Sequence, residues 1–506
     1  MVEEVRGAGR REWAALAVLI LAVSLLAVDA TVLILAIPSL TADLSVTSSQ
    51  LLWIGDIYSF TLAGLLVTMG NLADRIGRRR LLLLGSVGFA AASAIAAFAG
   101  SAEVLIAARV LLGISGATIM PSTLSIIRNL FDVPAQRTRA IAIWSAGITG
   151  GAALGPLVGG LLLEHFWWGS VFLINVPIVA LVVIGGAILL PESKNSDNPR
   201  VDLLSAALSF LAITPIVYAL KHAVNVGIDP TVVVSASFGV VAGLAFVHRQ
   251  RRLTSPLVDV SLFRVPAFSG AVITNTLAIF AFTGLLYFFS QFLQLVRGLS
   301  PLQAGLVELP SVVASIGVIA VAGPVVARVG TGPAIGLGLA VAAAGLGMLA
   351  LVAGQPGFTM IMTSLVVAGV GIGLTMTLSV DAVVTAVPKA RAGAASSVSE
   401  TAYELGVALG VAVLGSLQTA LYRHQLNLPA ATPDAMRRAA EDSLANAARA
   451  TNVATDVGRL VLETARHSFT TAMQYTTATA VALLLVAAFV AARIIPANRT
   501  NVASRD

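Results

Sequence analysis

Apolar stretches long enough to cross a lipid bilayer recur along the whole 506-residue chain. A membrane-spanning helix needs about 20 apolar residues, and we cut fourteen such windows from this sequence. Because lipid offers no partners to backbone polar groups, the windows predict an all-α polytopic membrane protein. Their approximate bounds are 13–37, 50–70, 80–100, 103–127, 138–162, 168–190, 203–221, 230–248, 266–291, 302–325, 333–354, 358–380, 394–417 and 471–495.

The composition excludes several classes of function. Hydrophobic residues make up 57% of the chain and charged residues 11%, whereas an ordinary globular domain has about 25% charged residues. The absence of cysteine excludes disulfides and thiol catalysis. The five histidines lie at window ends or in loops, and the chain has no phosphate-binding glycine-rich motif. We therefore expect no metal, no cofactor and no ATP hydrolysis, and the scattered basic residues argue against nucleic acid.

The basic residues predict the orientation of the chain. Sixteen of them lie in the first six even-numbered loops, whereas the first six odd-numbered loops hold only Lys221 and Arg297. Cytoplasmic loops of membrane proteins carry the excess of Lys and Arg. We therefore expect both termini in the cytoplasm. The loop at 418–470 is then external, and its charge-rich, helix-forming sequence predicts a small helical hairpin.

An internal repeat predicts the domain organisation. Gly70, Arg75, Gly77 and Gly85 each recur 253 residues later, and parallel repeats of this kind build many secondary transporters. We expect an N-terminal half with six spans, two inserted spans with their linkers, and a C-terminal half with six spans that includes the external loop. These parts cover residues 1–192, 193–260 and 261–506.

Four segments resemble signatures of the major facilitator superfamily. Its loop 2 signature is similar to Gly70-Asn-Leu-Ala-Asp-Arg-Ile-Gly-Arg-Arg-Arg80, and its span 4 signature to Arg109-Val-Leu-Leu-Gly-Ile-Ser-Gly116. The antiporter signature of span 5 resembles residues 147–160, and the span 1 signature of the 14-helix drug and proton antiporters resembles Val28-Asp-Ala-Thr-Val-Leu-Ile-Leu-Ala-Ile-Pro38. Residues 172–177 and 191–193 also fit, so the resemblance covers nearly the whole chain.

The resemblance implies a function as well as a fold. It implies the major facilitator fold with two additional helices in a bacterial inner-membrane protein, expected to be a monomer. Members of the QacA-like group export small cationic amphipathic drugs, and protons flow inward in exchange. Ethidium, acriflavine-type dyes, quaternary ammonium compounds and fluoroquinolones are the substrates to expect, and the lipid bilayer is the only other partner.

Five acidic residues lie within the windows: Asp29, Asp56, Glu308, Glu400 and Glu404. A carboxylate in hydrocarbon costs several kcal/mol, so its presence indicates proton or cation binding. Glu400 and Glu404 share one helical face, although this pair could instead serve hydrogen bonding between helices. Glu308, near the end of its window, could also lie among lipid headgroups.

One basic residue, Arg109, lies deep within a window and must find a carboxylate or carbonyl partner. We expect it to modulate proton coupling through Asp29 or nearby backbone. A purely structural pairing is the alternative.

Aromatic residues suggest a drug pocket. Trp53 and Phe60 share a helical face with Asp56, an arrangement that suits a flat organic cation. Trp53 could equally be an anchor at the membrane interface. Tyr287 and Phe289, in an aromatic run of window 9, could line the pocket as well, although lipid-facing aromatics are more common at this composition.

The remaining motifs predict conformational roles. Asp74 could accept hydrogen bonds from a facing helix while Arg75 and Arg78 stay at the cytoplasmic surface, which would make the segment from Gly70 through Gly77 a latch between the halves. The alternative is that the segment only fixes the orientation of the chain by its positive charge, which would account for the arginines but not for the glycines and Asp74. In window 5, the small residues and proline predict close packing and a bend; these are Gly151, Gly155, Pro156 and Gly159.

Two departures from the family pattern restrict the prediction. The acid of span 10 that confers recognition of divalent cations in QacA-type exporters is replaced by Ser315, and the acid pair of span 13 is only partly kept, with Ser399 next to Glu400. We therefore expect monovalent cations to be preferred. Export of an endogenous lipid or siderophore is an alternative, and an intramembrane enzyme or receptor is a more remote one.

Overall fold

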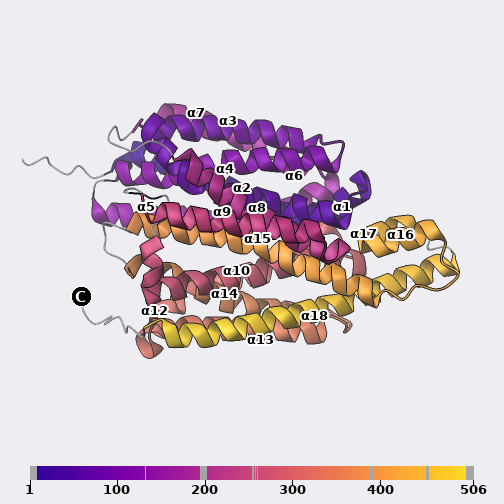
Figure 1. Ribbon diagram of the computed structural model, residues 1–506. Helices are drawn as coiled ribbons and strands as arrows, with labels where there is room; N and C mark the ends of the chain where they lie inside the picture. The colour runs from indigo at the N-terminus through magenta and orange to yellow at the C-terminus, as the bar shows by residue number, and fades with distance from the viewer. Residues whose placement is uncertain are drawn as a thin grey trace, which may run out of the picture.

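The computed structural model describes residues 8–496 except 132, 194–201, 254, 255, 257, 259, 387–391 and 452–454. Every regular element in this part of the chain is a helix (Figure 1). The N-terminal elements are α1 (Arg10–Leu44), α2 (Ser48–Ile76), α3 (Arg78–Ala97), α4 (Ala102–Leu130), α5 (Pro134–His165), α6 (Ser170–Leu173), α7 (Asn175–Leu189), α8 (Leu203–Val226) and α9 (Pro230–Gln250). The C-terminal elements are η1 (Val260–Arg264), α10 (Pro266–Gln291), η2 (Phe292–Val296), α11 (Pro301–Gly317), α12 (Ile319–Val329), α13 (Thr331–Val352), α14 (Thr359–Thr385), α15 (Ala392–Gln425), α16 (Asp434–Asp442), α17 (Leu444–Ala450) and α18 (Asp456–Ile494).

Long apolar helices confirm a multi-pass membrane protein. Within the described residues, ten helices are long and apolar enough to cross a membrane, and the pair α11 and α12, bent by 50°, makes up to eleven. The expected windows 50–70, 138–162 and 203–221 fall within α2, α5 and α8, which are also long helices. That all fourteen windows cross the membrane remains a prediction.

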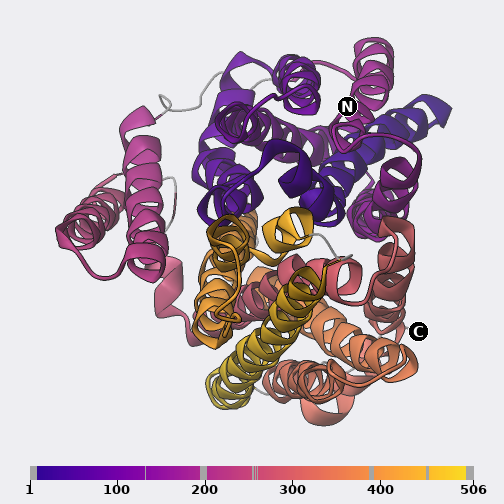
Figure 2. The same cartoon turned by 90° about the vertical axis from the view of Figure 1, so that its right-hand side faces the viewer.

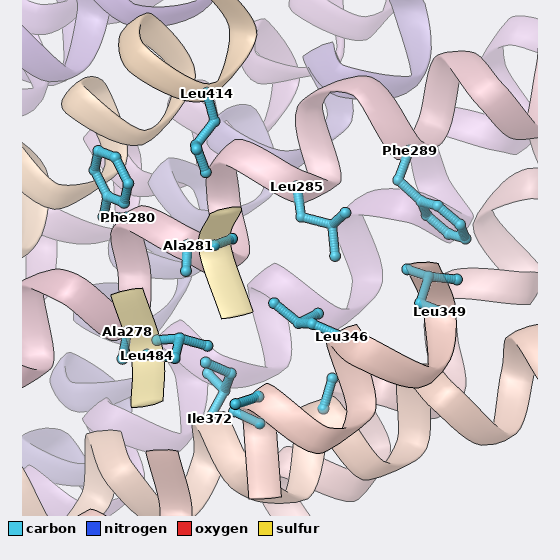
Figure 3. Packing of buried hydrophobic residues seen from close by; sticks show 14 of the residues in the cluster. Ala278, Phe280, Ala281, Leu285, Phe289, Leu346, Leu349, Ile372, Leu414 and Leu484 are labelled. Atoms are coloured by element: carbon cyan, nitrogen blue, oxygen red, sulfur yellow. The ribbon is translucent and has the colours of Figure 1, made fainter. Parts of the chain in front are cut away.

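Buried apolar side chains form two main clusters. One cluster consists of residues between Ala15 and Leu190 together with Tyr287 and Val411, and the other of residues between Leu262 and Ile495 together with Leu35. In the second, Phe280, Leu285 and Leu346 from α10 and α13 lie in the same packed layer (Figure 3). We call these two bodies the N-half and the C-half. The α8–α9 pair stands to one side of both in Figure 2.

Each half contacts the other along two seams. At the first seam, α2 packs against α15, and a Cβ atom added at Gly55 would lie 3.0 Å from the Tyr287 ring of α10. At the second seam, α5 packs against α11 so closely that a Cβ at Gly305 would lie 2.5 Å from the Pro156 carbonyl oxygen. Because lipid gives apolar helices little reason to associate, such backbone approach supplies the packing energy.

A turn with the same backbone geometry follows α2 and α12. Gly77 has φ +117° and Gly330 has φ +87°, a conformation that favours glycine. The two residues are the pair that the internal repeat aligns, 253 residues apart. The chain therefore uses one turn type at corresponding places in the two halves.

The α16–α17 pair lies at one end of the bundle and contacts both halves (Figure 1). On the C-half side, the Tyr422 hydroxyl donates to the Ala440 carbonyl oxygen at 2.7 Å. On the N-half side, the Asn446 side chain donates to the Val46 carbonyl oxygen at 3.2 Å, and the Ser48 hydroxyl donates to the Asp442 carbonyl oxygen. These contacts tie the halves together at this end.

Asp202 organises the start of the α8–α9 pair. Its carboxylate accepts from the Ser205 amide at 3.0 Å, which caps α8, and from the Arg249 guanidinium of α9 at 2.9 Å. Partial burial alone would disfavour the charge, but the Arg249 and Ser205 hydrogen bonds outweigh it and hold the pKa of Asp202 below its usual value. The ion pair thus joins the two inserted helices where α8 begins and α9 ends.

We expect Gly345→Ala to destabilise the C-half. A Cβ there would lie 2.3 Å from the Ala368 backbone nitrogen, so α13 and α14 would have to separate. Overpacking of this kind costs about 1–3 kcal/mol, and the thermal unfolding midpoint in detergent should fall. Gly347→Ala, on the same helix with open space around it, is the matched control. Equal midpoints for the two variants would contradict the prediction.

Candidate functional site

A buried ion pair lies at the centre of the N-half. The Arg109 guanidinium of α4 lies 3.3 Å from the Asp29 carboxylate of α1, and the two side chains are 2% and 0% exposed. The Asn175 side-chain amide of α7 donates to the other Asp29 oxygen at 2.7 Å, and also to the Ser93 hydroxyl of α3 at 3.0 Å. Because a buried charge without a partner is very costly, this network holds four helices in one arrangement.

Arg109 also reaches the backbone of α2. Its Nε atom donates to the Ile54 carbonyl oxygen at 3.1 Å, and one of its terminal nitrogens donates to the Gly55 carbonyl oxygen at 3.5 Å. The guanidinium carbon lies 4.6 Å from the centre of the Tyr58 ring. The cation thus combines carboxylate, carbonyl and aromatic partners.

Tyr58 and its neighbour Ser59 extend this network towards the C-half. Glu404 of α15 lies near both Ser59 and Tyr58 of α2. Glu400, one helical turn away on α15, interacts with Glu404. Both glutamates are half-buried. Asp29, Arg109, Tyr58 and Glu404 therefore form a series of charged and polar groups that crosses the first seam.

A small cavity lies beside this series. Residues of α1, α2, α4, α10 and α15 line it, among them Tyr58, Ser59, Arg109 and Tyr287. Its volume is about 40 Å³, and one buried water needs roughly 10–15 Å³ on this measure. The cavity can hold a few water molecules but not a dye, so drug binding needs a more open arrangement.

Three of the four predicted pocket residues do not line this cavity. Phe60 is 1% exposed and packs with Val217, Ala408 and Ala412 where α2, α8 and α15 meet. Phe289 is fully buried in the C-half cluster (Figure 3). Trp53 is half-buried and does not line the cavity, whereas Tyr287 does.

The aromatic run of α10 corrects a second expectation. Tyr287, Phe288, Phe289 and Phe292 are all at most 4% exposed, so none of them faces lipid. The sequence could not predict this burial, because a helix that is hydrophobic on all sides does not indicate which side faces the protein interior. The helix is enclosed by neighbours on several sides.

Some site residues were missed because their signal is weak. Asn175 lies in the segment Phe172-Leu-Ile-Asn-Val-Pro177. This segment resembles the family pattern, but the resemblance assigned no role to Asn175. Tyr58 and Ser59 lie on α2 beside the helix face that carries Trp53 and Phe60, which we had assigned to the pocket. Consecutive residues of a helix point in directions about 100° apart, so an error of one residue in the assigned face changes which side chains line the cavity.

The side chains of Asp56 and Asp74 are outside the described part of the structure, so their predicted roles remain predictions. Near the loop 2 motif, Glu192 accepts hydrogen bonds from the backbone amides of Arg79 and Arg80, each at 3.2 Å. A Cβ at Gly77 would lie 2.6 Å from this carboxylate. Glu192 therefore caps the start of α3, where a helix attracts negative charge.

The small residues of α5 form two contact faces. A Cβ at Gly151 or Gly159 would lie 2.6 Å from the Ser24 carbonyl oxygen or 2.5 Å from the Val32 side chain of α1, and Gly155 faces Thr31 in the same way. Pro156, on another side, contacts Gly305 of α11. Glu308 lies one turn along α11 from that contact and is 5% exposed, which excludes a headgroup position for its side chain.

We expect the Asp29–Arg109 pair to show strong energetic coupling. Asp29→Asn or Arg109→Gln leaves one buried charge without its partner, which costs about 3–5 kcal/mol. The double variant removes both charges and should lose less stability than the two single losses added together. Unfolding of all four proteins in detergent measures the coupling. Additive losses within about 0.5 kcal/mol would show that the pair is not coupled.

Comparisons with known proteins agree with this architecture. The chain is 45% identical to the multidrug efflux pump LfrA of Mycolicibacterium smegmatis, over 95% of each chain. It is 36% identical to the methyl viologen resistance protein SmvA of Salmonella typhimurium, over 91% of this chain and 93% of the relative. It is 32% identical to the multidrug resistance protein Stp of Mycobacterium tuberculosis, over 81% and 77%.

A similar fold occurs in solved structures. A bacterial homologue of the human lysosomal transporter Spinster superposes with a TM-score of 0.67 at 18% identity, over 96% of this chain and 98% of that chain. The model of the Major Facilitator Superfamily matches residues 19–411. The chain therefore belongs to the major facilitator superfamily and is a multi-pass membrane transport protein, not an enzyme.

Proposed function

We propose that this protein is a proton-driven antiporter that exports lipophilic cations across the bacterial inner membrane. The observation that carries the proposal is the series Asp29, Arg109, Tyr58 and Glu404, which crosses from one half to the other beside a closed cavity. The names of three relatives, two multidrug proteins and a resistance protein for methyl viologen, support a drug as the cargo.

The proposed topology has fourteen spans in two six-helix halves, with α8 and α9 inserted between them. The excess of basic residues in the even-numbered loops supports cytoplasmic termini. On this topology, the α16–α17 pair is an external hairpin. Its contacts with Val46 and Ser48 then close the external side of the seam in this arrangement.

The proposed mechanism separates two kinds of carboxyl group. Asp29 has the Arg109 cation beside it and is proposed to couple to protons through this pair, while Glu400 and Glu404 are near each other and have no basic partner that the structure describes. Two such carboxylates resist simultaneous ionisation. Protons from outside would neutralise Glu404 or Glu400, which releases a cationic drug, and rocking of the halves would return the site to the cytoplasm.

Asp56, on α2 of the same seam, is proposed as a further acid of this set. Arg109 would transmit the state of Asp29 to α2 through the Ile54 and Gly55 carbonyl groups. Cationic dyes and quaternary ammonium compounds are the proposed substrates, with fluoroquinolones as a further class. The protein is expected to work as a monomer, because the site is built within a single chain.

Replacement of the α15 acids should uncouple transport. In proteoliposomes with an imposed pH gradient, Glu404→Gln or Glu400→Gln should lower ethidium efflux roughly tenfold or more, because an amide cannot exchange a proton or pair with a cation. Glu463→Gln, an exposed residue of α18, is the matched control. A protonophore should abolish efflux by the unmodified protein. Full gradient-driven efflux by Glu404→Gln would exclude its assigned role.

Substrate charge provides a separate prediction. Ser315 replaces the acid that the family uses for divalent cations, so a monovalent dye should be exported better than a divalent one. Methyl viologen is a flat dication and names one relative, which makes it a demanding probe. We expect ethidium efflux to exceed methyl viologen efflux at equal concentration. Equal rates would show that Ser315 does not set this preference.

A further inference from the structure

A second buried carboxyl group lies outside the central series, at the α5–α11 seam. The buried face of α11 consists of Ala304, Gly305, Glu308 and Ser311, whereas Val313 on the opposite side is 58% exposed. Glu308 is itself 5% exposed. Its side chain therefore points into the protein at a position where the two halves meet.

Backbone contacts on both sides of Glu308 fix its surroundings. One turn before it, a Cβ at Gly305 would lie 2.5 Å from the Pro156 carbonyl oxygen of α5. One turn after it, the Ser311 carbonyl oxygen lies against Gly369 of α14. Glu308 is therefore held between an N-half helix and a C-half helix, and movement of α5 away from α11 would uncover it.

One oxygen of this carboxyl group lacks a hydrogen-bond donor. The Oε1 atom is buried and has no hydrogen-bond partner within the described residues. A buried carboxyl group without a donor or a cation is least costly as the neutral acid.

Among the described side chains, no cation is paired with Glu308 to compensate a negative charge. Arg109 is engaged with Asp29. The ionisable residues on the elements that pack against α11 are Arg10, Arg11, Glu12, Asp29 and Asp43 on α1, Arg137, Arg139, Glu164 and His165 on α5, Arg328 on α12 and Asp381 on α14.

We propose that Glu308 is a proton-binding site separate from the central acids, which binds its proton while α5 and α11 are packed together and releases it when they separate. An unpaired buried carboxylate costs several kcal/mol, so the closed seam holds the neutral form. Separation admits water, and the carboxyl ionises. The closed seam therefore binds the proton more tightly, and by linkage low pH stabilises the closed seam while high pH favours separation.

This inference rests on the proposed function for one point, that α5 and α11 separate during a transport cycle. The site does not need a drug. It makes the opening of the second seam dependent on pH even when the central cavity is empty. A metal ion does not explain the site, since the described residues contain no cluster of His, Asp or Glu that could ligate one.

The test measures the seam directly. The chain has no cysteine, so spin labels can be placed at Leu161→Cys on α5 and Leu306→Cys on α11, which are 55% and 48% exposed. Distances between the labels in lipid nanodiscs are recorded by pulsed electron paramagnetic resonance between about pH 5 and about pH 9, without drug or gradient. We expect the ratio of separated to closed seam to rise by roughly fivefold or more with pH.

Variants then assign this change to Glu308. Glu308→Gln, which imitates the protonated form, should stay closed and lose most of the pH response. Glu308→Asp should keep a response, which covers the case in which the glutamine variant fails to fold. Glu164→Gln, an exposed carboxyl on α5, should behave as the unmodified protein does.

Three results would overturn the proposal. These are distances that do not change with pH, an undiminished response in Glu308→Gln, and a response that follows sodium concentration at constant pH. Ethidium efflux by the labelled protein is measured in parallel. If efflux fails while the seam still responds to pH through Glu308, the proposed substrate or direction is wrong and the proton site stands.

Discussion

The cost of an unpaired charge in an apolar interior governs the arrangement of this protein. Arg109 can lie deep within the N-half because Asp29 stands 3.3 Å away and two carbonyl groups of α2 accept hydrogen bonds from two of its other N–H groups. Asn175 supports the carboxylate from α7. The pair is weak evidence for extra stability, since its own desolvation is costly. It specifies how α1, α2, α4 and α7 sit against one another.

The same cost applies to the other buried acids, which have no cation beside them in the described structure. Glu400 and Glu404 have each other and the polar groups of α2, and Glu308 has no partner within the described structure. A carboxyl without a cation beside it can be buried easily only as the neutral acid. The protein therefore contains one buried acid with an arginine beside it and others with no basic partner among the described residues.

The close packing of helices at the two seams lets the N-half and the C-half move apart as rigid bodies. At both seams the helices meet through small residues or proline, such as Gly55 at α2 and Gly305 at α11. Contacts of this kind have few interlocking side chains, so rigid halves can separate without repacking their own cores. The α16–α17 pair adds polar contacts across one end of the first seam. Opening at that end must break a small number of identifiable hydrogen bonds.

Residues that act through position were harder to predict than residues that act through charge. Asp29 and Arg109 stood out because ionisable groups are rare in apolar windows, and the structure brings them together. Phe60 and Phe289 lie away from the cavity, and their role in drug binding stays a prediction. Nearly every side of their helices is apolar, and a pattern without contrast does not indicate a direction. Tyr58, Ser59 and Asn175 were missed because tyrosine, serine and asparagine occur in many neutral roles.

The class of the protein can be read from its amino acids alone: the apolar windows require membrane helices, the repeat indicates two related halves, and the ionisable residues within the windows indicate transport. The turns at Gly77 and Gly330 are local too, because a positive φ depends on local backbone chemistry. The folded arrangement was needed to show which acid has a cation beside it, which aromatic rings reach the cavity, and that Glu308 faces the second seam. These depend on the rotation of each helix about its axis, which is set by contacts between residues hundreds of positions apart.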